Sequence, residues 1–368
     1  MAKKKICWVT ADYFTDSDLQ YDILDGLCKT FSIDWYILEG KTPYFTRDMY
    51  RHVESIKDLR IHFLVNHYRT RDPRSVMFYL KLYKLIKRTK ADLIYYNVAP
   101  NPASALIIHL MDKKKLICTA HDGKAQNDSS KFGAIRTWSY NAIYKHVDHI
   151  NMFSEAQAEL MQKTYGPKDV HIMRLALKNM GNAPDNKPHD YVRFLSFGHI
   201  IYQKNIDLLI EAGNILYERG YHNFRISING TCDNWDFYQD KIAHKEIFEC
   251  NPNFITNDEL LELFGSSNFA VFPYRRVSQS GVLKLAFNYN LPVIVSNIGS
   301  FKEEVAEGTN GFFFEVGNAE NLADVMERCL NMFPEEYKYL CDKMRDYIKE
   351  NYSSESIVRS YTSLFNSL

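Results

Sequence analysis

The sequence predicts an α/β protein with two doubly wound domains, and three observations lead to this fold class. Short β-branched or aromatic runs alternate with segments whose apolar residues recur about every 3.6 positions, as in the βαβ units of a parallel sheet. The length of 368 residues suits two domains of about 100 to 200 residues each. A turn-rich segment, K-N-M-G-N-A-P-D-N-K-P-H from Lys178 to His189, interrupts the alternation and predicts an interdomain linker.

The first domain, residues 1–178, is predicted to contain six strands. These are Lys5–Thr10, Ser32–Leu38, Arg60–Val65, Ala91–Tyr96, Lys115–Ala120 and His149–Phe153. Between several of them the apolar spacing is helical, for example at Ala103, Leu106, Ile107 and Leu110. This order of elements predicts a parallel sheet.

The second domain, residues 179–350, repeats the alternation. Its predicted strands are Phe194–Phe197, Arg225–Asn229, Ile247–Glu249, Phe269–Pro273, Pro292–Ser296 and Phe312–Phe314. Its predicted helices are Asn205–Tyr217, Asn257–Phe264, Gly281–Asn288, Asn321–Cys329 and Glu335–Glu350. A last helix, Glu355–Phe365 within residues 351–368, is predicted to pack back on the first domain. Ligands of open parallel sheets bind beyond the carboxyl ends of the strands, so we expect the loops there to line an interdomain cleft.

Composition excludes several classes of protein. The longest apolar runs, such as residues 103–111 with their interruption at His109, are shorter than the roughly 18 to 20 residues that cross a bilayer. Residues 6–11 are too short for a signal-peptide core. Seven scattered cysteines without a Cys-x-x-Cys pair fit a reducing cytoplasm. The loop after the first strand, T-A-D-Y-F-T-D, lacks the glycines of a dinucleotide site or a P-loop, and no motif predicts a metal.

Charge is balanced overall but unevenly distributed. Residues 1–178 carry 28 Lys plus Arg against 19 Asp plus Glu, and the remainder carries 17 against 26. Between Arg47 and Lys90 there are 12 basic residues and four acidic ones. Such a segment suits anionic lipid, nucleic acid or a phosphorylated acceptor, and it equally suits a solvated face that only keeps the protein soluble.

Two segments of the second domain could bind an anion. In Phe197–Ala212, Lys204 precedes an amphipathic helix, and a lysine there adds its charge to backbone N–H groups that suit a diphosphate. In Phe272–Ala286, Ser280 and Gly281 open a helix after a basic loop. The structural alternatives are an exposed lysine in a first turn and an ordinary N-cap serine.

Two further segments follow predicted strands. His121-Asp122-Gly123 comes directly after Lys115–Ala120, where a histidine could hydrogen-bond a sugar hydroxyl or donate a proton toward a leaving phosphate. The alternative is a turn or core histidine. Gly299–Glu304, G-S-F-K-E-E, follows the strand Pro292–Ser296, and its acids also suit a helix start.

Taken together, these segments resemble the second domain of the family-4 glycosyltransferases. The resemblance spans Phe194 to about Cys329 and includes R-I-S-I-N-G, F-A-V-F-P-Y and S-G-V-L-K-L-A-F-N-Y-N-L-P-V-I-V-S-N-I-G-S-F-K-E-E. The first domain is similar more loosely, through His121-Asp122 and N-M-F-S-E-A-Q. The resemblance implies the GT-B fold, an acceptor site in the first domain, a nucleotide-sugar in the second, and transfer with retention, usually without a metal.

The resemblance also implies roles for particular residues. The predicted donor-binding residues are Gly198, His199, Lys204, Gly230, Ser280, Gly281 and Val282. The predicted catalytic residues are His121 and Asp122, which would face the transferred sugar.

Three positions depart from the family pattern. His199 replaces the usual arginine, so one of the two diphosphate cations is either missing or dependent on pH. Val277 and Leu285 occupy the places of a glutamate pair that contacts the donor. Asp12, Tyr13 and Phe14 replace a glycine pair in the first-strand loop.

The sequence as a whole therefore predicts a cytoplasmic hexosyltransferase that extends a surface glycan, with a glycan or lipid-linked glycan as acceptor. It is expected to contact the anionic inner face of the plasma membrane through its basic domain, to need no cofactor beyond the nucleotide-sugar, and to bind no nucleic acid. The alternatives are an inactive GT-B scaffold subunit of a glycan-assembly complex and a nucleotide-sugar 2-epimerase, which shares the fold.

Overall fold

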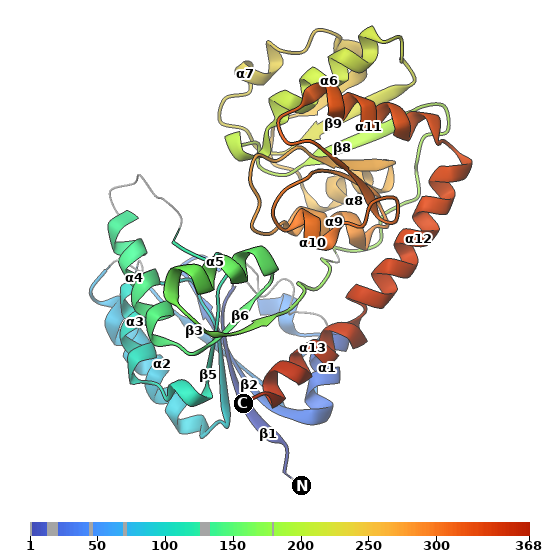
Figure 1. Ribbon diagram of the computed structural model, residues 1–368. Helices are drawn as coiled ribbons and strands as arrows, with labels where there is room; N and C mark the ends of the chain where they lie inside the picture. The colour runs from blue at the N-terminus through green and yellow to red at the C-terminus, as the bar shows by residue number, and fades with distance from the viewer. Residues whose placement is uncertain (1, 13–20, 44–46, 69–71, 126–132, 179) are drawn as a thin grey trace. The chain divides into compact units, whose positions relative to one another are not determined.

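A computed structural model of the chain describes residues 2–12, 21–43, 47–68, 72–125, 133–178 and 180–368. The chain divides into two compact units (Figure 1). Unit 1 comprises Met1–Ala176 and Ser353–Leu368, and unit 2 comprises Leu177–Tyr352. Unit 1 is therefore assembled from both ends of the sequence.

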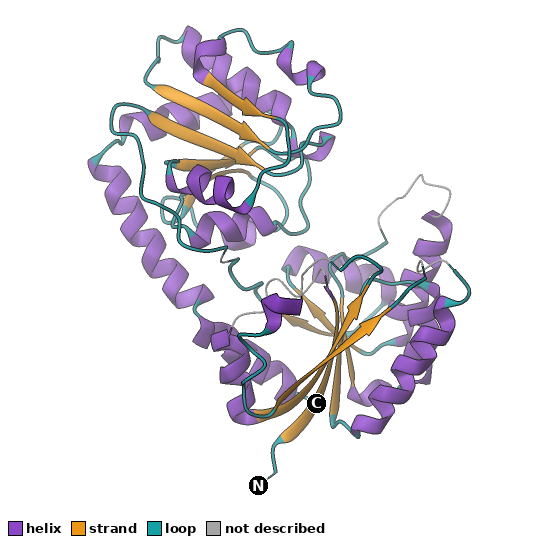
Figure 2. Cartoon of the chain, turned by 180° about the vertical axis from the view of Figure 1, so that it is seen from behind, coloured by secondary structure: helices purple, strands orange, loops and turns teal. Residues whose placement is uncertain are grey.

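The sheet of unit 1 has seven parallel strands in the order β3-β2-β1-β4-β5-β6-β7. The strands are β1 (Lys4–Ala11), β2 (Phe31–Glu39), β3 (Leu59–Val65), β4 (Leu93–Asn97), β5 (Leu116–Thr119), β6 (His149–Met152) and β7 (Asp169–Ile172). Its helices are α1 (Tyr21–Thr30), α2 (Ser75–Thr89), α3 (Pro102–Leu110), α4 (Gly133–His146), α5 (Glu155–Tyr165) and α13 (Ser354–Asn366). Helices α2 to α5 cover one face of the sheet, and α1 and α13 cover the other (Figure 2).

The last helix supplies part of the core of unit 1. Trp8 of β1 is buried, and its ring centroid lies 5.1 Å from that of Tyr361 and 5.8 Å from that of Phe365, both on α13. Buried aromatic side chains contribute about 3 to 5 kcal/mol each to stability. The prediction that a C-terminal helix returns to the first domain is confirmed.

The sheet of unit 2 has six parallel strands in the order β10-β9-β8-β11-β12-β13. The strands are β8 (Val192–Phe197), β9 (Phe224–Asn229), β10 (Phe248–Asn251), β11 (Phe269–Phe272), β12 (Val293–Ser296) and β13 (Gly311–Phe314). Its helices are α6 (Ile206–Glu218), α7 (Asp236–Gln239), α8 (Asn257–Gly265), α9 (Gly281–Asn288), α10 (Phe301–Glu304), α11 (Ala319–Asn331) and α12 (Glu335–Tyr352). Helices α6 and α11 pack on one face of this sheet, and α8, α9 and α12 pack on the other.

The predicted two-domain α/β fold is confirmed, with each predicted strand and helix ending within two residues of its expected bounds. Strand β7 was not predicted, because D-V-H-I is only four residues long and partly buried, so it lacks the apolar run that marks the other strands. Within the described residues, no helix has both the length and the apolar character needed to cross a bilayer.

Candidate anion site in unit 2 and cavities of unit 1

Two glycines shape the carboxyl end of the sheet in unit 2. Gly198 follows β8 and Gly230 follows β9, both with positive φ, at 101° and 135°. A Cβ atom on Gly230 would lie 2.5 Å from the carbonyl oxygen of Gly198, and one on Gly198 would lie 2.6 Å from Nζ of Lys204. Both positions therefore require glycine, because the backbone and the lysine approach each other too closely for a side chain.

Lys204 lies at the centre of this arrangement. It ends the short 3₁₀ turn Tyr202–Lys204 before α6, and its Nζ donates a hydrogen bond to the carbonyl oxygen of Phe197 at 3.2 Å. Burial lowers the pKa of Lys204 to about 8, and no carboxylate within the described ranges lies within ion-pair distance. A desolvated ammonium without a counter-ion is a favourable place for an anion.

Arg275, in the basic loop after β11, holds the turn that carries Lys204. Its backbone N–H donates to the carbonyl oxygen of Gln203 at 2.8 Å, and its guanidinium donates to Oδ2 of Asp207 at 3.0 Å. The guanidinium also lies 4.2 Å from the ring centre of Tyr202. These contacts commit Arg275 to positioning the turn, so it is not available as a free anion-binding cation.

Helix α9 begins beside Lys204. Ser280 is its N-cap, and its Oγ accepts a hydrogen bond from the N–H of Leu283 at 3.2 Å. The N–H groups of Gly281 and Val282, in the first turn, have no intrahelical acceptor. Cγ2 of Val282 lies 3.4 Å from the place of a Cβ on Gly198, so the start of α9 and the Lys204 turn meet at one point. Ser280 is therefore an N-cap, and this role is compatible with an anion at the same helix start.

Two residues of this site were missed by the sequence analysis. Nζ of Lys178 lies 3.2 Å from the place of a Cβ on Gly281, which puts a second ammonium at the start of α9. The hydroxyl of Tyr274 lies beside Ser280, yet within the described chain it is buried without a partner of hydrogen-bond geometry. Lys178 precedes α9 by more than a hundred positions and carries no local signal. Tyr274 did carry a local signal, because it is a polar aromatic residue just beyond a buried strand.

His199 stands next to Gly198 and is exposed. Its Nδ1 is 2.7 Å from Oγ1 of Thr231, a hydroxyl that can donate to a neutral imidazole or accept from a protonated one. The geometry therefore permits both charge states of His199 at this edge.

The segment Gly299–Glu304 has a structural role. Gly299 has a φ of 48°, and a Cβ there would lie 2.4 Å from the carbonyl oxygen of Val277. Glu304 is buried and forms an ion pair with Lys284 of α9. Leu285, where the family has a glutamate, is buried in the apolar core of the unit.

The candidate catalytic residues of unit 1 follow β5. Nε2 of His121 lies 3.2 Å from Oδ1 of Asn97, and its ring centroid lies 5.4 Å from that of Phe153. The backbone carbonyl of Asp122 accepts a hydrogen bond from the hydroxyl of Tyr140. His121 and Asp122 both line a cavity of about 220 Å³. This placement gives both side chains access to a small polar ligand.

A second cavity of unit 1, of about 680 Å³, includes Asp12 of the first-strand loop. It is also lined by Glu39, Tyr68 and Phe78, and it shares Arg136 with the cavity at His121. Tyr13 and Phe14 lie outside the described residues. Carboxylates, aromatic rings and a guanidinium together suit a ligand with many hydroxyl groups.

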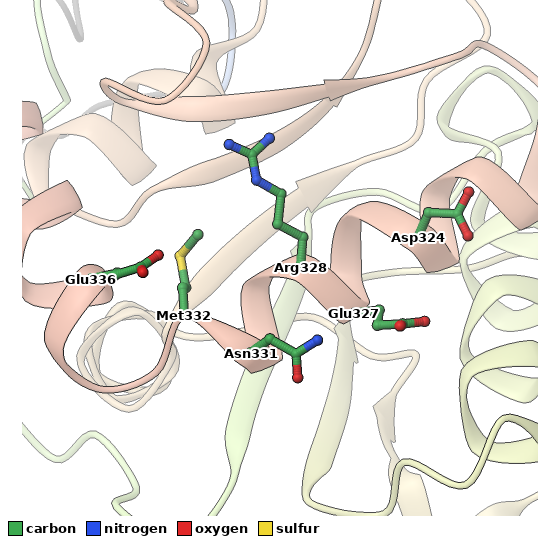
Figure 3. A pocket seen from close by; sticks show the side chains of 6 residues that line it. All are labelled: Asp324, Glu327, Arg328, Asn331, Met332 and Glu336. Atoms are coloured by element: carbon green, nitrogen blue, oxygen red, sulfur yellow. The ribbon is translucent and has the colours of Figure 1, made fainter.

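A third hollow, of about 470 Å³, lies on unit 2 between α11 and the start of α12 (Figure 3). Two of its carboxylates are already paired, since Arg219 bonds Asp324 at 2.8 Å and Glu327 at 3.1 Å. Arg328 is likewise bonded to Glu307 at 3.0 Å. This hollow is a surface ion-pair network remote in sequence from the Lys204 turn and α9.

Comparison with known families bears on both units. Residues 182–352 match the family model of "Glycosyl transferases group 1", and residues 35–175 match that of "Glycosyltransferase Family 4". The chain belongs to the family-4 glycosyltransferases. The resemblance inferred from the sequence is thereby confirmed, including for the first unit, where the motifs were sparse.

Individual relatives of this glycosyltransferase agree with the assignment. It is 25% identical over 139 residues to the capsular polysaccharide biosynthesis glycosyltransferase CapM of Staphylococcus aureus, and the match covers 36% of this chain and 35% of CapM. The chain thus spans about a third of the length of that curated relative.

Two solved structures resemble the whole of this glycosyltransferase. One is a glycosyltransferase from Rickettsia africae, with a TM-score of 0.72 and 14% identity over 100% of this chain and 99% of that one. The other is HepE of Anabaena in complex with UDP and glucose, with a TM-score of 0.69 and 12% identity over 99% and 100%. At these identities the likeness establishes the GT-B fold.

Proposed function

We propose that the protein moves a hexose from a nucleotide-sugar to a glycan or lipid-linked glycan acceptor, with retention of configuration. The observation that carries this proposal is the ammonium of Lys204, which is desolvated, lacks a carboxylate partner within the described residues and adjoins the start of α9. A diphosphate is the anion that such a site fits. The nucleoside and sugar parts of the donor are inferred from the family to which the chain belongs.

In this proposal unit 2 binds the donor. Lys204 and the N–H groups of Ser280, Gly281 and Val282 hold the diphosphate, with Lys178 as a second cation. When the bond from the anomeric carbon to the phosphate oxygen breaks, negative charge grows on the diphosphate. Fixed donors and cations stabilise that charge, which is the main contribution an enzyme makes to such a step.

The remaining predicted residues take supporting roles. Gly198 and Gly230 let the backbone approach the donor, and His199 adds a positive charge when it is protonated. Unit 1 binds the acceptor, with His121 and Asp122 facing the transferred sugar. The proposal requires no metal and no further cofactor.

An inactive scaffold subunit is the second candidate. The buried Leu285 favours it, because an apolar side chain in the core cannot accept hydrogen bonds from a ribose. Both candidates bind a nucleoside diphosphate, but only the transferase consumes a nucleotide-sugar. Binding without turnover across a panel of donors and acceptors would therefore identify the scaffold.

Replacing Lys204 with alanine should weaken the binding of a nucleoside diphosphate by about 1.5 to 3 kcal/mol, or roughly 10- to 150-fold. Affinity of the unmodified protein should fall as the pH rises through about 8, because the ammonium loses its proton there. The variant should not show this fall. Titration calorimetry with UDP, GDP and ADP at several pH values measures both effects.

Lys245→Ala is the matched control, since Lys245 is an exposed lysine of the same unit. It should leave affinity and melting temperature unchanged. Equal affinity of the Lys204→Ala variant and the unmodified protein would place the diphosphate elsewhere.

We further propose peripheral contact with an anionic membrane, but through a narrower surface than the whole segment Arg47–Lys90. Several arginines of that segment are paired with carboxylates: Arg47 with Glu39, Arg51 with Asp48, Arg60 with Asp34 and Arg74 with Asp72. A guanidinium whose charge is offset by a paired carboxylate leaves little net attraction for lipid.

Most of the positive charge that remains in the described part of this segment lies on α2. Met77, Lys81, Lys84 and Arg88 are exposed at helical spacing, so they form one stripe. The neighbouring helices add exposed apolar side chains, Leu106 and Leu110 on α3 and Ile135 and Trp138 on α4. Basic and apolar groups together are what an interfacial surface requires.

Flotation with liposomes tests this surface. The protein should float with anionic vesicles at low salt and not with neutral ones, and 0.5 M salt should release it because screening shortens the reach of charge. A variant with Lys81, Lys84 and Arg88 changed to glutamate should remain at the bottom of the flotation gradient with either kind of vesicle. The same charge change at Lys245, Lys338 and Lys349 of unit 2 is the control. Equal recovery of all samples would disprove the membrane proposal and leave the transferase proposal intact.

A further inference from the structure

Three side chains that metal ions favour converge at the amino edge of the sheet in unit 1. His149 is the first residue of β6, Asp169 is the first residue of β7, and the two are paired across the strands. His171 follows two positions after Asp169, so its side chain is on the same face of the sheet. The cluster therefore joins the edge strand β7 to its neighbour.

The ligand atoms are close together and reachable. Nδ1 of His149 lies 2.7 Å from Oδ2 of Asp169, and Nε2 of His171 lies 3.2 Å from the same oxygen. All three atoms fall within 4.8 Å of one another. The Asp169 side chain is 51% exposed, whereas those of the two histidines are about 20% exposed, so the carboxylate is the one free to adjust.

We propose that His149, Asp169 and His171 form an open binding site for a divalent transition-metal ion of the zinc type. Two imidazole nitrogens and one carboxylate oxygen are ligands that such ions prefer, and three protein ligands leave one position for water. Bonds of about 2.0 to 2.2 Å place tetrahedral ligands roughly 3.3 to 3.5 Å apart, so Oδ2 of Asp169 has to retreat from His149 by less than an ångström.

In the described part of the chain, two nearby lysines are bonded to acceptors outside the cluster and not to Asp169. Nζ of Lys113 is 2.9 Å from Oδ2 of Asp148. Nζ of Lys168 donates to the carbonyl oxygens of Lys145 at 3.2 Å and Val147 at 2.7 Å. The alternative is that Asp169 only accepts hydrogen bonds from the two histidines. The two hypotheses differ in whether added metal stabilises the fold.

The position of the cluster indicates a structural ion. His149 and Asp169 begin their strands, whereas His121 follows the carboxyl end of β5, at the opposite edge of the sheet. A metal at this point would hold β7 to β6, its one strand neighbour among the described residues, shortly before the chain leaves unit 1 at Ala176. The inference is independent of the proposed reaction.

The test uses the full chain without an affinity tag, in a reducing buffer, and the metal ions themselves as probes. Zn²⁺, Ni²⁺ and Co²⁺ should raise the melting temperature in proportion to their occupancy, while Mg²⁺ should not, since it prefers all-oxygen sites. Co²⁺ should give visible d–d bands without the thiolate charge-transfer band that cysteine ligands would add. The absence of that band excludes the partly exposed Cys232, Cys250 and Cys341.

His149→Gln and His171→Gln should each reduce Zn²⁺ affinity at least tenfold and leave the melting temperature of the metal-free protein nearly unchanged. His189→Gln, a change of the same type at an exposed position of unit 2, should bind as the unmodified protein does. The proposal is wrong if Zn²⁺ produces no shift in the unmodified protein, or if the shift survives in either variant of the cluster.

Discussion

Replacing Lys284 with alanine is expected to lower the free energy of unfolding by about 3 to 5 kcal/mol, because it strands a buried carboxylate. The side chain of Lys284 is 2% exposed and that of its partner Glu304 is 10% exposed. The hydroxyl of Tyr352 joins them, lying 3.2 Å from Nζ of Lys284 and donating to Oε2 of Glu304 at 3.0 Å. Losing the ammonium removes the only cation of this network within the described chain.

A double variant separates the cost of the stranded charge from the cost of lost packing. Lys284→Met with Glu304→Gln removes both charges while keeping their approximate volumes and an acceptor for Tyr352. It should recover most of the lost stability, since neutral replacement of a buried pair is often tolerated. Urea unfolding gives the free energies, and hydrogen exchange on α9 and α10 assigns the change to unit 2. A single variant as stable as the unmodified protein would show that water reaches Glu304.

Replacing His121 with alanine is expected to lower turnover by about 100-fold or more, while donor affinity and melting temperature stay nearly constant. The imidazole lines the cavity beyond β5, and its Nε2 faces Oδ1 of Asn97, which holds the ring in one orientation. The donor for this assay comes from a thermal-shift screen over nucleotide-sugars, because a ligand of the folded state raises its melting temperature.

If His121 has only a structural role, the expected result is the opposite, with stability lowered and turnover per folded molecule unchanged. A histidine that only braces the turn before Gly123 would, when truncated, cost about 1 to 3 kcal/mol of stability. Activity would then fall only as folded protein is lost. Turnover per folded molecule, compared with that of the His189→Gln control, distinguishes these outcomes. A destabilised variant with normal specific turnover would remove His121 from the catalytic residues.

The fold could be predicted because each strand and the linker are recognisable from a short stretch of sequence. The buried parallel strand β12, V-I-V-S, begins with three β-branched residues, and the segment from Lys178 to His189 is rich in turn-forming residues. The half-exposed β7 has neither property, so it was missed. The cluster at Asp169 was therefore missed too, because it lies partly on β7 and its two histidines are 22 positions apart in the sequence.

The site could be predicted only in part, for the same reason. Lys204 and Ser280 were found because each sits beside its own helix start. The ammonium of Lys178 reaches Gly281 from a distant segment, and the buried pair of Lys284 and Glu304 joins two separate helices. Only the packed chain brings these groups together, since no spacing rule connects them.

The return of α13 to Trp8 has a consequence for synthesis on the ribosome. Tyr361 and Phe365, which complete the aromatic core around β1, are translated after the whole of unit 2. Nascent domains usually fold in order from the amino terminus, at about 5 to 20 residues added per second. Here unit 2 has its full sequence before unit 1 does, and Trp8 lacks its contacts with α13 until that helix has been made. Until then α1 is present on this face of the sheet but α13 is not, so we expect the nascent chain to bind chaperones that recognise exposed apolar surface.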